Sequence, residues 1–251
     1  MSGTANDYAL EISGLCKSFG GLPVTQDVSL AVRPGERRLI IGPNGAGKTT
    51  LFNQITGEIR PNAGTIKLFG RDVTRFDPQT RAHHGLSRTY QIITLFPNDT
   101  VQHNICLGIM GLRPARWHMF KPLTAYPDVI AEARRVLDLV GLSDLAGQTI
   151  SSLAYGEKRR IEIAMALAQN PRVLLLDEPL AGLSSAERAT IKSLIVAIPR
   201  STTIVIIEHD MDTALNLADT VTLLHYGKVI IDGERDEVIA HEKTREVYLG
   251  Q

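Results

Sequence analysis

The residues with the most specific chemistry form a glycine-rich segment near the start of the chain. This segment fits the pattern G-x-x-x-x-G-K-[ST] and reads Gly42-Pro43-Asn44-Gly45-Ala46-Gly47-Lys48-Thr49. In that pattern, backbone N–H groups converge on phosphate oxygens at a helix N-terminus, where the helix dipole favours an anion. We expect Lys48 to hold the β- and γ-phosphates and the Thr49 hydroxyl to bind Mg²⁺. The alternative, a glycine turn followed by a chance Lys-Thr pair, is disfavoured by the flanking elements.

Two adjacent carboxylates follow a short apolar run much later in the chain. Residues 173–176 are Val-Leu-Leu-Leu, and Asp177 and Glu178 come directly after them. In open α/β sheets, ligands bind outside the carboxyl ends of such buried strands. We therefore expect Asp177 to hold Mg²⁺ through its water shell and Glu178 to orient or deprotonate an attacking water. Alone, an Asp-Glu pair here is typical of a turn or a helix start, so the prediction depends on the phosphate loop.

The elements needed to position these groups can be read from the surrounding pattern. Residues 38–41 form an apolar strand, and residues 48–55 contain good helix formers up to Gly57, so the glycine-rich segment lies between a strand and a helix. Antiparallel strands are expected earlier, and further buried strands alternate with helices later in the chain. The expected antiparallel strands are residues 8–15, 28–32 and the hairpin at 64–70, and the later strands are residues 173–176, 203–207 and 221–224.

A helical insertion interrupts this alternation. Apolar residues recur at helical spacing after Asp128, which we expect to cap that helix, whereas the proline-rich stretch 108–127 is expected to be a surface excursion. The predicted fold is α/β in a single domain. Its expected parts are a core of residues 1–92 and 166–235 with an antiparallel β subdomain, a helical subdomain of residues 93–165, and a helical tail of residues 236–251.

Composition narrows the class of protein. The 251 residues allow one large domain or two small ones, and 27 basic residues balance 27 acidic residues. This neutrality argues against a general nucleic-acid binder. Cys16 and Cys106 lack the spacing of a zinc site, the N-terminal segment lacks the pattern of a secretory signal, and no apolar run reaches the ~18 residues that span a bilayer. We expect a cytoplasmic protein whose membrane partners, if any, are other chains.

Further motifs follow in an order typical of one family. The segment Leu153-Ala154-Tyr155-Gly156-Glu157 corresponds to an LSGGQ signature, and Asp177 follows it 20 residues later. Gln91 fits a Q-loop, residues 181–184 fit a D-loop, and His209 fits a switch histidine. Each residue alone has an ordinary structural explanation, but together they resemble the ATP-binding cassette (ABC) family from about residue 10 to residue 250.

The resemblance implies a fold, a reaction and a set of site residues. It implies a P-loop ATPase core in which two subunits face head to tail, each ATP lying between one phosphate loop and the other subunit's signature loop. Glu178, His209, Lys48 and Gln91 are the implied catalytic residues, and Thr49, Gln91 and Asp177 are the implied Mg²⁺ ligands. The implied ATP contacts are Phe19, which stacks on adenine, Gly42, Pro43, Asn44, Gly45, Ala46, Gly47, Lys48, Thr49, Thr50, Gln91, Leu153, Ala154, Tyr155, Gly156 and Glu157.

The signature departs from the family pattern at one position that matters. The family's serine, which offers a hydroxyl to the partner's γ-phosphate, is Ala154 here. A lost hydrogen bond to a charged group costs ~1.5–3 kcal/mol, so we expect weakened ATP sandwiching and expect Ala154→Ser to strengthen it. After the signature, Arg159 and Arg160 are expected to lie on a solvated helix face.

Within the family, the segments at residues 87–97 and 155–164 look like those of branched-chain amino-acid importer ATPases. The resemblance implies a second ATPase subunit, identical or different, membrane permease subunits, an indirect solute-binding protein and no nucleic acid. The location implied is the inner face of the membrane. Three alternatives stay open: a lipopolysaccharide-export ATPase, a soluble ABC ATPase of repair or translation, and a nucleotide sensor with little turnover.

Overall fold

The computed structural model describes residues 7–90, 95–117, 121–209 and 214–249. The strands are β1 (Leu10–Phe19), β2 (Leu22–Val32), β3 (Arg37–Ile41), β4 (Ala63–Leu68), β5 (Arg71–Asp72), β6 (Leu86–Arg88), β7 (Val173–Asp177), β8 (Thr203–Ile207), β9 (Thr220–His225) and β10 (Lys228–Glu234). The helices are α1 (Lys48–Thr56), α2 (Pro78–His83), α3 (Val101–Gly111), α4 (Pro127–Leu139), α5 (Tyr155–Leu167), α6 (Ser185–Ala197), α8 (Arg235–Ala240) and α9 (Glu242–Leu249). Within the described ranges, no helix is long and apolar enough to cross a membrane.

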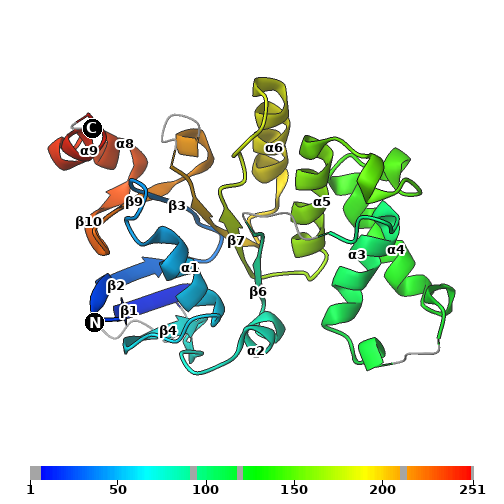
Figure 1. Ribbon diagram of the computed structural model, residues 1–251, viewed down its shortest axis with the longest axis horizontal. Coiled ribbons are helices and arrows are strands. Elements are labelled where there is room, and N and C mark those ends of the chain that lie inside the picture. The colour runs from blue at the N-terminus through cyan, green and yellow to red at the C-terminus, as the bar shows by residue number, and fades with distance from the viewer. Residues whose placement is uncertain (1–6, 91–94, 118–120, 210–213, 250–251) are drawn as a thin grey trace. The chain divides into compact units, whose positions relative to one another are not determined.

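The chain divides into two compact units (Figure 1). The first comprises Met1–Arg88, Arg172–Leu180 and Ile198–Gln251, and the second comprises Thr89–Pro171 and Ala181–Ala197. The first unit contains both sheets, and the second contains α3, α4, α5 and α6.

A six-stranded sheet in the first unit has the order β10-β9-β3-β8-β7-β6. The strands from β9 to β6 pair in parallel, and β10 pairs antiparallel with β9 at one edge. β3, β7 and β8 are buried along their whole length, as expected for apolar strands of a parallel sheet. The register pairs Ile207 with both Ile40 and Asp177. The carboxyl ends of β3, β7 and β8 therefore lie side by side at the same end of the sheet.

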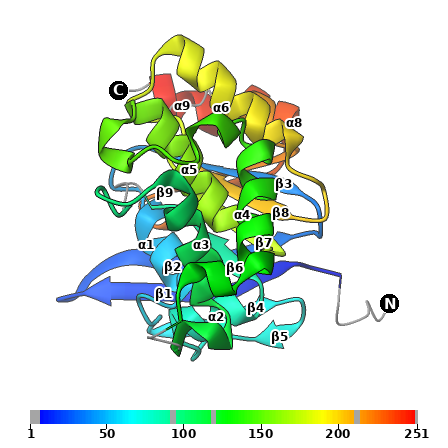
Figure 2. The same cartoon turned by 90° about the vertical axis from the view of Figure 1, so that its right-hand side faces the viewer.

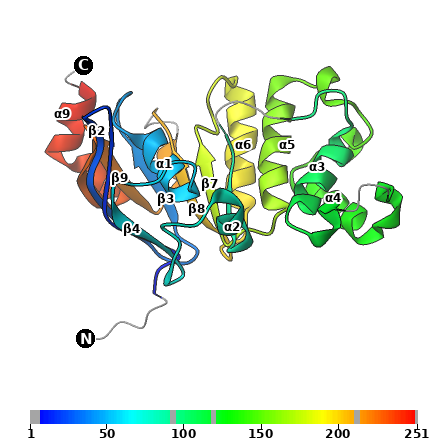
Figure 3. The same cartoon turned by 60° about the horizontal axis from the view of Figure 1, so that its bottom comes forward.

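The second sheet of this unit is antiparallel, in the order β2-β1-β4-β5. Helix α1 packs against both sheets, because its buried Leu51, Phe52 and Ile55 share one apolar cluster with Ile40 of β3 and with residues of β1, β2 and β4 (Figure 3). This arrangement confirms the antiparallel β subdomain beside a parallel core. It also fixes the start of α1 at the end of β3, where the glycine-rich segment lies.

The helices α3, α4 and α5 of the second unit contact one another and run together as a bundle (Figure 2). Two local predictions were wrong. Asp128 does not cap α4, since Tyr126 occupies the N-cap and Pro127 is the first helical residue, a position that suits the fixed φ of proline. The proline-rich stretch was expected from residue 108, but α3 continues to Gly111.

Candidate functional site

The glycine-rich segment turns from β3 into α1 through tightly packed backbone. The amide of Ala46 donates to the carbonyl of Pro43 at 3.1 Å, and the amide of Gly227 donates to the carbonyl of Ala46 at 2.9 Å. Gly47 has a left-handed φ of 99° as the N-cap of α1, and a Cβ there would lie 2.6 Å from the carbonyl oxygen of Val24. Glycine is therefore required, and the first amides of α1 are presented at a helix N-terminus, which suits an anion.

The side chain of Lys48 folds back over this turn. Its Nζ donates to the carbonyl oxygens of Gly42 at 2.6 Å and Pro43 at 3.1 Å, and the residue is only 6% exposed. Burial lowers the pKa of Lys48, and the negative charges of Glu178, Asp177 and Glu208 oppose that shift. The ammonium group donates hydrogen bonds to two backbone carbonyls and lies within the electrostatic influence of three carboxylates. A bound phosphate could replace the two carbonyls as its hydrogen-bond partner.

Two of the predicted catalytic residues come together at the ends of β7 and β8. Glu178 Oε2 lies 3.8 Å from His209 Nδ1, and the amide of Glu178 donates to the carbonyl of Ile207 at 3.0 Å. Glu178 has a left-handed φ of 45°, a conformation that costs energy outside glycine and is often kept at functional sites. The side chain of His209 is 50% exposed and that of Glu178 is 16% exposed. Both are therefore accessible at the carboxyl ends of the strands.

Glu208 stiffens the loop that carries these two residues. It is 1% exposed, and its Oε1 accepts a hydrogen bond from the amide of Leu180 at 2.9 Å. Its Oε2 lies 4.0 Å from His209 Nδ1. Glu208 was not predicted as a site residue, because a carboxylate that binds a distant backbone amide leaves no local sequence pattern.

The side-chain oxygens of Thr49 and Asp177 are suitable ligands for a magnesium ion that is bound together with a nucleotide. Both offer oxygen, which Mg²⁺ prefers, and Thr49 is exposed at the start of α1. In the described part of the chain, no group of three or more His, Cys, Asp or Glu side chains could form a metal site alone. Such a sparse set of protein ligands is what Mg²⁺ requires when phosphates and water complete its shell.

Of the two remaining predicted ligands in the first half of the chain, the structure describes Phe19 but not Gln91. Phe19 ends β1, is 45% exposed, and has Lys17 Nζ 5.2 Å from its ring centroid, so its ring can take a stacked base. Gln91 was predicted to bind Mg²⁺ and nucleotide, and it lies outside the described residues. Its role stays a prediction.

The signature segment forms the N-terminus of α5 in the second unit. The helix begins at Tyr155, with Ala154 at the N-cap. The amide of Ala154 donates to Glu157 Oε2 at 2.8 Å, and the amide of Gly156 donates to Glu187 Oε1 at 3.2 Å. Two carboxylates thus lie on backbone amides of the segment that the family resemblance places against the partner's ATP, and the amide of Gly156 is the one implied to face the partner.

Arg159 was expected on a solvated face, and this was wrong. Its side chain is 1% exposed, with Nη1 2.5 Å from Glu162 Oε2 and donating to the carbonyl of Tyr90 at 2.8 Å. Glu162 Oε1 accepts from the amide of Tyr90 at 3.1 Å. The two side chains together fix both backbone groups of the residue before Gln91. The short spacing of Arg159 and Glu162 on α5 could have indicated an ion pair.

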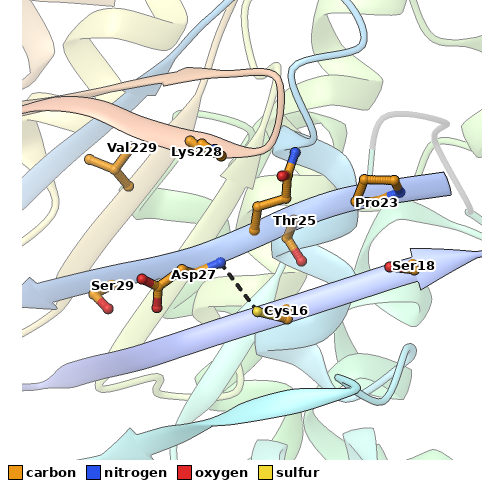
Figure 4. Close-up of a pocket in the computed structure, with 9 residues that line it drawn as sticks. Cys16, Ser18, Pro23, Thr25, Asp27, Ser29, Lys228 and Val229 are labelled. Carbon is orange, nitrogen blue, oxygen red and sulfur yellow. Dashed lines mark hydrogen bonds between the residues drawn. The ribbon is translucent and has the colours of Figure 1, made fainter. Parts of the chain in front are cut away.

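A separate pocket of about 650 Å³ lies beside β1, β2 and β10 (Figure 4). Its wall includes Cys16, whose sulfur accepts a hydrogen bond from the amide of Asp27 at 3.2 Å. The lining residues are Cys16, Ser18, Pro23, Thr25, Gln26, Asp27, Ser29, Lys228 and Val229. None of the predicted site residues lines this pocket, so it is not the phosphate site.

Comparison with known families decides what kind of protein this is. The family model described as ABC transporter matches residues 25–181, which include the glycine-rich segment, the signature segment and both acidic residues after β7. The chain belongs to the ABC transporter family. Its cassette is an ATP-binding subunit with ATPase function, as the resemblance implied.

Relatives match this cassette over nearly its whole length. The branched-chain amino acid transport ATP-binding protein LivG of Salmonella typhimurium is 35% identical, covering 96% of this chain and 98% of LivG. BraF of Pseudomonas aeruginosa, described in the same terms, is 34% identical over the same shares of the two chains. The ADP conformation of the cassette MJ1267 has a TM-score of 0.83 and 30% identity, covering 97% of this chain and 99% of MJ1267. These matches confirm the predicted fold class.

Proposed function

We propose that this ABC ATPase binds Mg²⁺ and ATP at the carboxyl ends of β3, β7 and β8 and powers import of branched-chain or related amino acids through a separate permease. The observation that carries the ATP site is the burial of Lys48 beside the glycine-rich turn, with carboxylates of Asp177, Glu178 and Glu208 close enough to affect its pKa. Phosphate oxygens are a natural ligand for that ammonium group and for the first amides of α1.

The groups of the nucleotide site have separate tasks in ATP binding and hydrolysis. The backbone N–H groups of residues 44–50 wrap the phosphates, with Gly42 and Pro43 forming the turn that leads into them, and Phe19 stacks on the adenine. Glu178 accepts a proton from the attacking water, and His209 contacts the γ-phosphate from the neighbouring strand end. The 3.8 Å between Glu178 and His209 supports this assignment, because both side chains can then reach one reacting group.

The metal would be held by Thr49 and Asp177, with Gln91 as a further ligand. When bound, Mg²⁺ neutralises charge on the β- and γ-phosphate oxygens. The oxygen donors of Thr49 and Asp177 support the choice of this ion.

The signature segment acts on a second cassette. Leu153, Ala154, Tyr155, Gly156 and Glu157 would meet the γ-phosphate bound by a partner subunit, identical or different, so that ATP joins the two cassettes. The position of the segment at the N-terminus of α5 supports this role, because a helix N-terminus favours an anion. We also keep as part of this proposal that residues 93–165 form the helical subdomain that carries the signature segment and that residues 236–251 form a helical tail.

The transported solute is inferred from the relatives. LivG and BraF are named for branched-chain amino acid transport, and this chain covers almost all of their length. The same inference gives the partners as permease subunits and, indirectly, a solute-binding protein. It places the cassette on the inner face of the membrane through its permease.

Uptake in a strain lacking this gene tests the proposal. We expect the wild-type chain to restore uptake of labelled leucine, isoleucine and valine, and Glu178→Gln to fail. Glu11→Gln, a charge change in the Glu11–Lys67 pair of β1 and β4, serves as the matched control and should restore uptake.

Other outcomes separate the parts of the proposal. Restored uptake of a different solute would make the amino-acid assignment wrong but keep the transporter role. Hydrolysis stimulated by DNA or RNA, without any effect on uptake, would favour a soluble ABC ATPase. Absence of ATP binding by the purified chain in the presence of Mg²⁺ would overturn the nucleotide site itself.

A further inference from the structure

Arg88 connects the acidic end of β7 to the helix that follows the phosphate loop. β6 pairs in parallel with β7, Arg88 lies opposite Leu175, and β6 ends there while β7 continues two residues to Asp177. The Arg88 side chain spans this difference, and its Nη2 donates to Asp177 Oδ2 at 2.6 Å. The side chains of Arg88 and Asp177 are 6% and 2% exposed, so the ion pair is buried.

The other arm of the same guanidinium reaches α1. Nη1 donates to Asn53 Oδ1 at 2.6 Å and lies 3.3 Å from Glu58 Oε2. Asn53 is four residues after Thr49, so both side chains lie on one face of α1. The planar, five-donor guanidinium can hold two acceptors at a fixed angle, which a lysine ammonium cannot. Arg88 therefore ties Asp177 to the face of the helix that carries Thr49.

We propose that Arg88 is a positioning residue for the metal–nucleotide site, holding the Asp177 carboxylate at the orientation that a Mg²⁺ water shell needs. By binding Oδ2, Arg88 sets the direction of Oδ1. By binding Asn53, it sets the carboxylate's place relative to Thr49. This inference rests on the proposed function, because it takes Thr49 and Asp177 as the protein's metal ligands.

A purely structural ion pair and a positioning pair differ in what their loss affects. Removing a side chain that hydrogen-bonds to a metal ligand typically weakens metal binding by about 10–100-fold. A structural pair would change only the unfolding temperature. Asn53, Glu58 and Asp177, the partners of Arg88 given above, lie outside the phosphate loop, so binding of metal-free ATP should survive replacement of Arg88.

The test measures ATP binding by calorimetry with EDTA and across a Mg²⁺ titration, and Mn²⁺ binding to the ATP complex by electron paramagnetic resonance. Arg88→Gln and Arg88→Lys are compared with Arg38→Gln. Arg38 is the matched control, because it forms a similarly buried pair with Glu36 at 2.7 Å, with side chains 5% and 9% exposed, at the start of β3 rather than its end.

We expect both Arg88 variants to bind ATP in EDTA as the wild type does. Both should need at least ~10-fold more Mg²⁺ for half of the metal-dependent gain in affinity, and they should bind Mn²⁺ correspondingly more weakly. Arg38→Gln should lose stability and keep the wild-type metal requirement. If Arg88→Gln does not fold, Arg88→Lys decides the question, because it keeps the charge and loses only the fork.

The proposal is overturned if Arg88→Lys and Arg88→Gln keep the wild-type metal requirement, or if either binds Mg²⁺ more tightly. A wild-type requirement in Arg88→Lys alone would mean that charge, not orientation, is what matters, and would also overturn it. Failure of the wild-type chain to bind ATP with Mg²⁺ is a different result, which contradicts the proposed function instead.

Discussion

The amide of Gly156 and the carboxylate of Glu187 lie 3.2 Å apart, joining the N-terminus of α5 to the first turn of α6. Glu187 Oε2 also accepts hydrogen bonds from the amide of Ser184 at 2.9 Å and from its hydroxyl at 2.6 Å. A Cβ at residue 156 would lie 2.4 Å from Glu187 Oε1, so only glycine permits this approach. An internal anion thus occupies the amide assigned to a partner's γ-phosphate.

Replacing Glu187 with glutamine should therefore strengthen ATP-dependent association of the cassettes. The side chain keeps an acceptor for Ser184 and loses the charge that opposes an incoming phosphate. We expect the ATP concentration for half-maximal dimerisation to fall by roughly threefold to tenfold. Light scattering or analytical ultracentrifugation across an ATP titration, in a Glu178→Gln background that prevents turnover, measures it.

The matched control is Glu132→Gln on α4. Glu132 belongs to the same unit and pairs with Arg135 at 2.7 Å on α4, not with the N-terminus of α5. Glu132→Gln removes one negative charge, as Glu187→Gln does. Dimerisation of this control should match the parent protein. A weaker dimer in Glu187→Gln would show that the carboxylate orders the signature segment for ATP rather than competing with it.

Lys48 is expected to cost stability in the absence of nucleotide. Burial lowers its pKa, so the folded chain carries a poorly solvated charge at neutral pH. We expect Lys48→Met to raise the unfolding free energy by about 1 kcal/mol, or ~2–4 °C in Tm, a gain typical of replaced functional groups. ATP with Mg²⁺ should raise the Tm of the wild type and leave that of the variant unchanged.

The pH dependence of this difference is fixed by the direction of the pKa shift. Because folding lowers the pKa of Lys48 below its ordinary 10.5, the folded chain binds fewer protons than the unfolded chain at alkaline pH. Wild-type stability attributable to Lys48 therefore rises with pH through the folded pKa. The advantage of Lys48→Met should shrink toward pH 10.5, and a variant that unfolds several degrees below wild type at pH 7 contradicts the argument.

Local patterns predicted most elements of the fold. The all-buried apolar runs of β7 and β8 and the turn from β3 into α1 have short-range signals, and the structure places them within a residue or two. The cap at Asp128 was misplaced because Pro127 is itself a favourable first residue of a helix. Element boundaries depend on such competition between neighbouring residues.

The side chains around the candidate site were less predictable than its motifs. Arg88 binds a carboxylate 89 residues away in sequence, and Glu187 binds an amide 31 residues away. Neither spacing has a local periodicity that would identify the pair. Arg159 looked solvated because its neighbour is also arginine, yet tertiary packing buries it against Tyr90 and Glu162.

Glu178 is expected to be the main determinant of turnover. Its left-handed backbone and its position 3.8 Å from His209 direct the carboxylate toward the exposed edge of the sheet. Glu178→Gln removes the proton acceptor and keeps the shape, so we expect ATP hydrolysis to fall by about 10²–10⁴-fold while ATP binding persists. Single-turnover hydrolysis and gel filtration with ATP should show a stable ATP-bound dimer. Wild-type turnover would transfer the role to another residue.

Ala154→Ser should make the opposite change, adding a group instead of removing one. Ala154 is the N-cap of α5, and its amide is already bound by Glu157. A serine there can accept from the Glu157 amide through its oxygen while its hydroxyl hydrogen remains for a γ-phosphate. We expect a gain of ~0.5–2 kcal/mol in stability from the cap, and tighter ATP-dependent dimerisation.

Ser152→Ala separates this effect from a general loss or gain of hydroxyl groups nearby. The hydroxyl of Ser152 donates to the carbonyl of Thr149 at 2.8 Å, so its removal should leave ATP-dependent dimerisation unchanged. The two properties of Ala154→Ser are measured independently, by thermal unfolding without nucleotide and by association across an ATP titration. A rise in Tm with unchanged association would show that the added hydroxyl caps α5 and does not reach the partner's nucleotide.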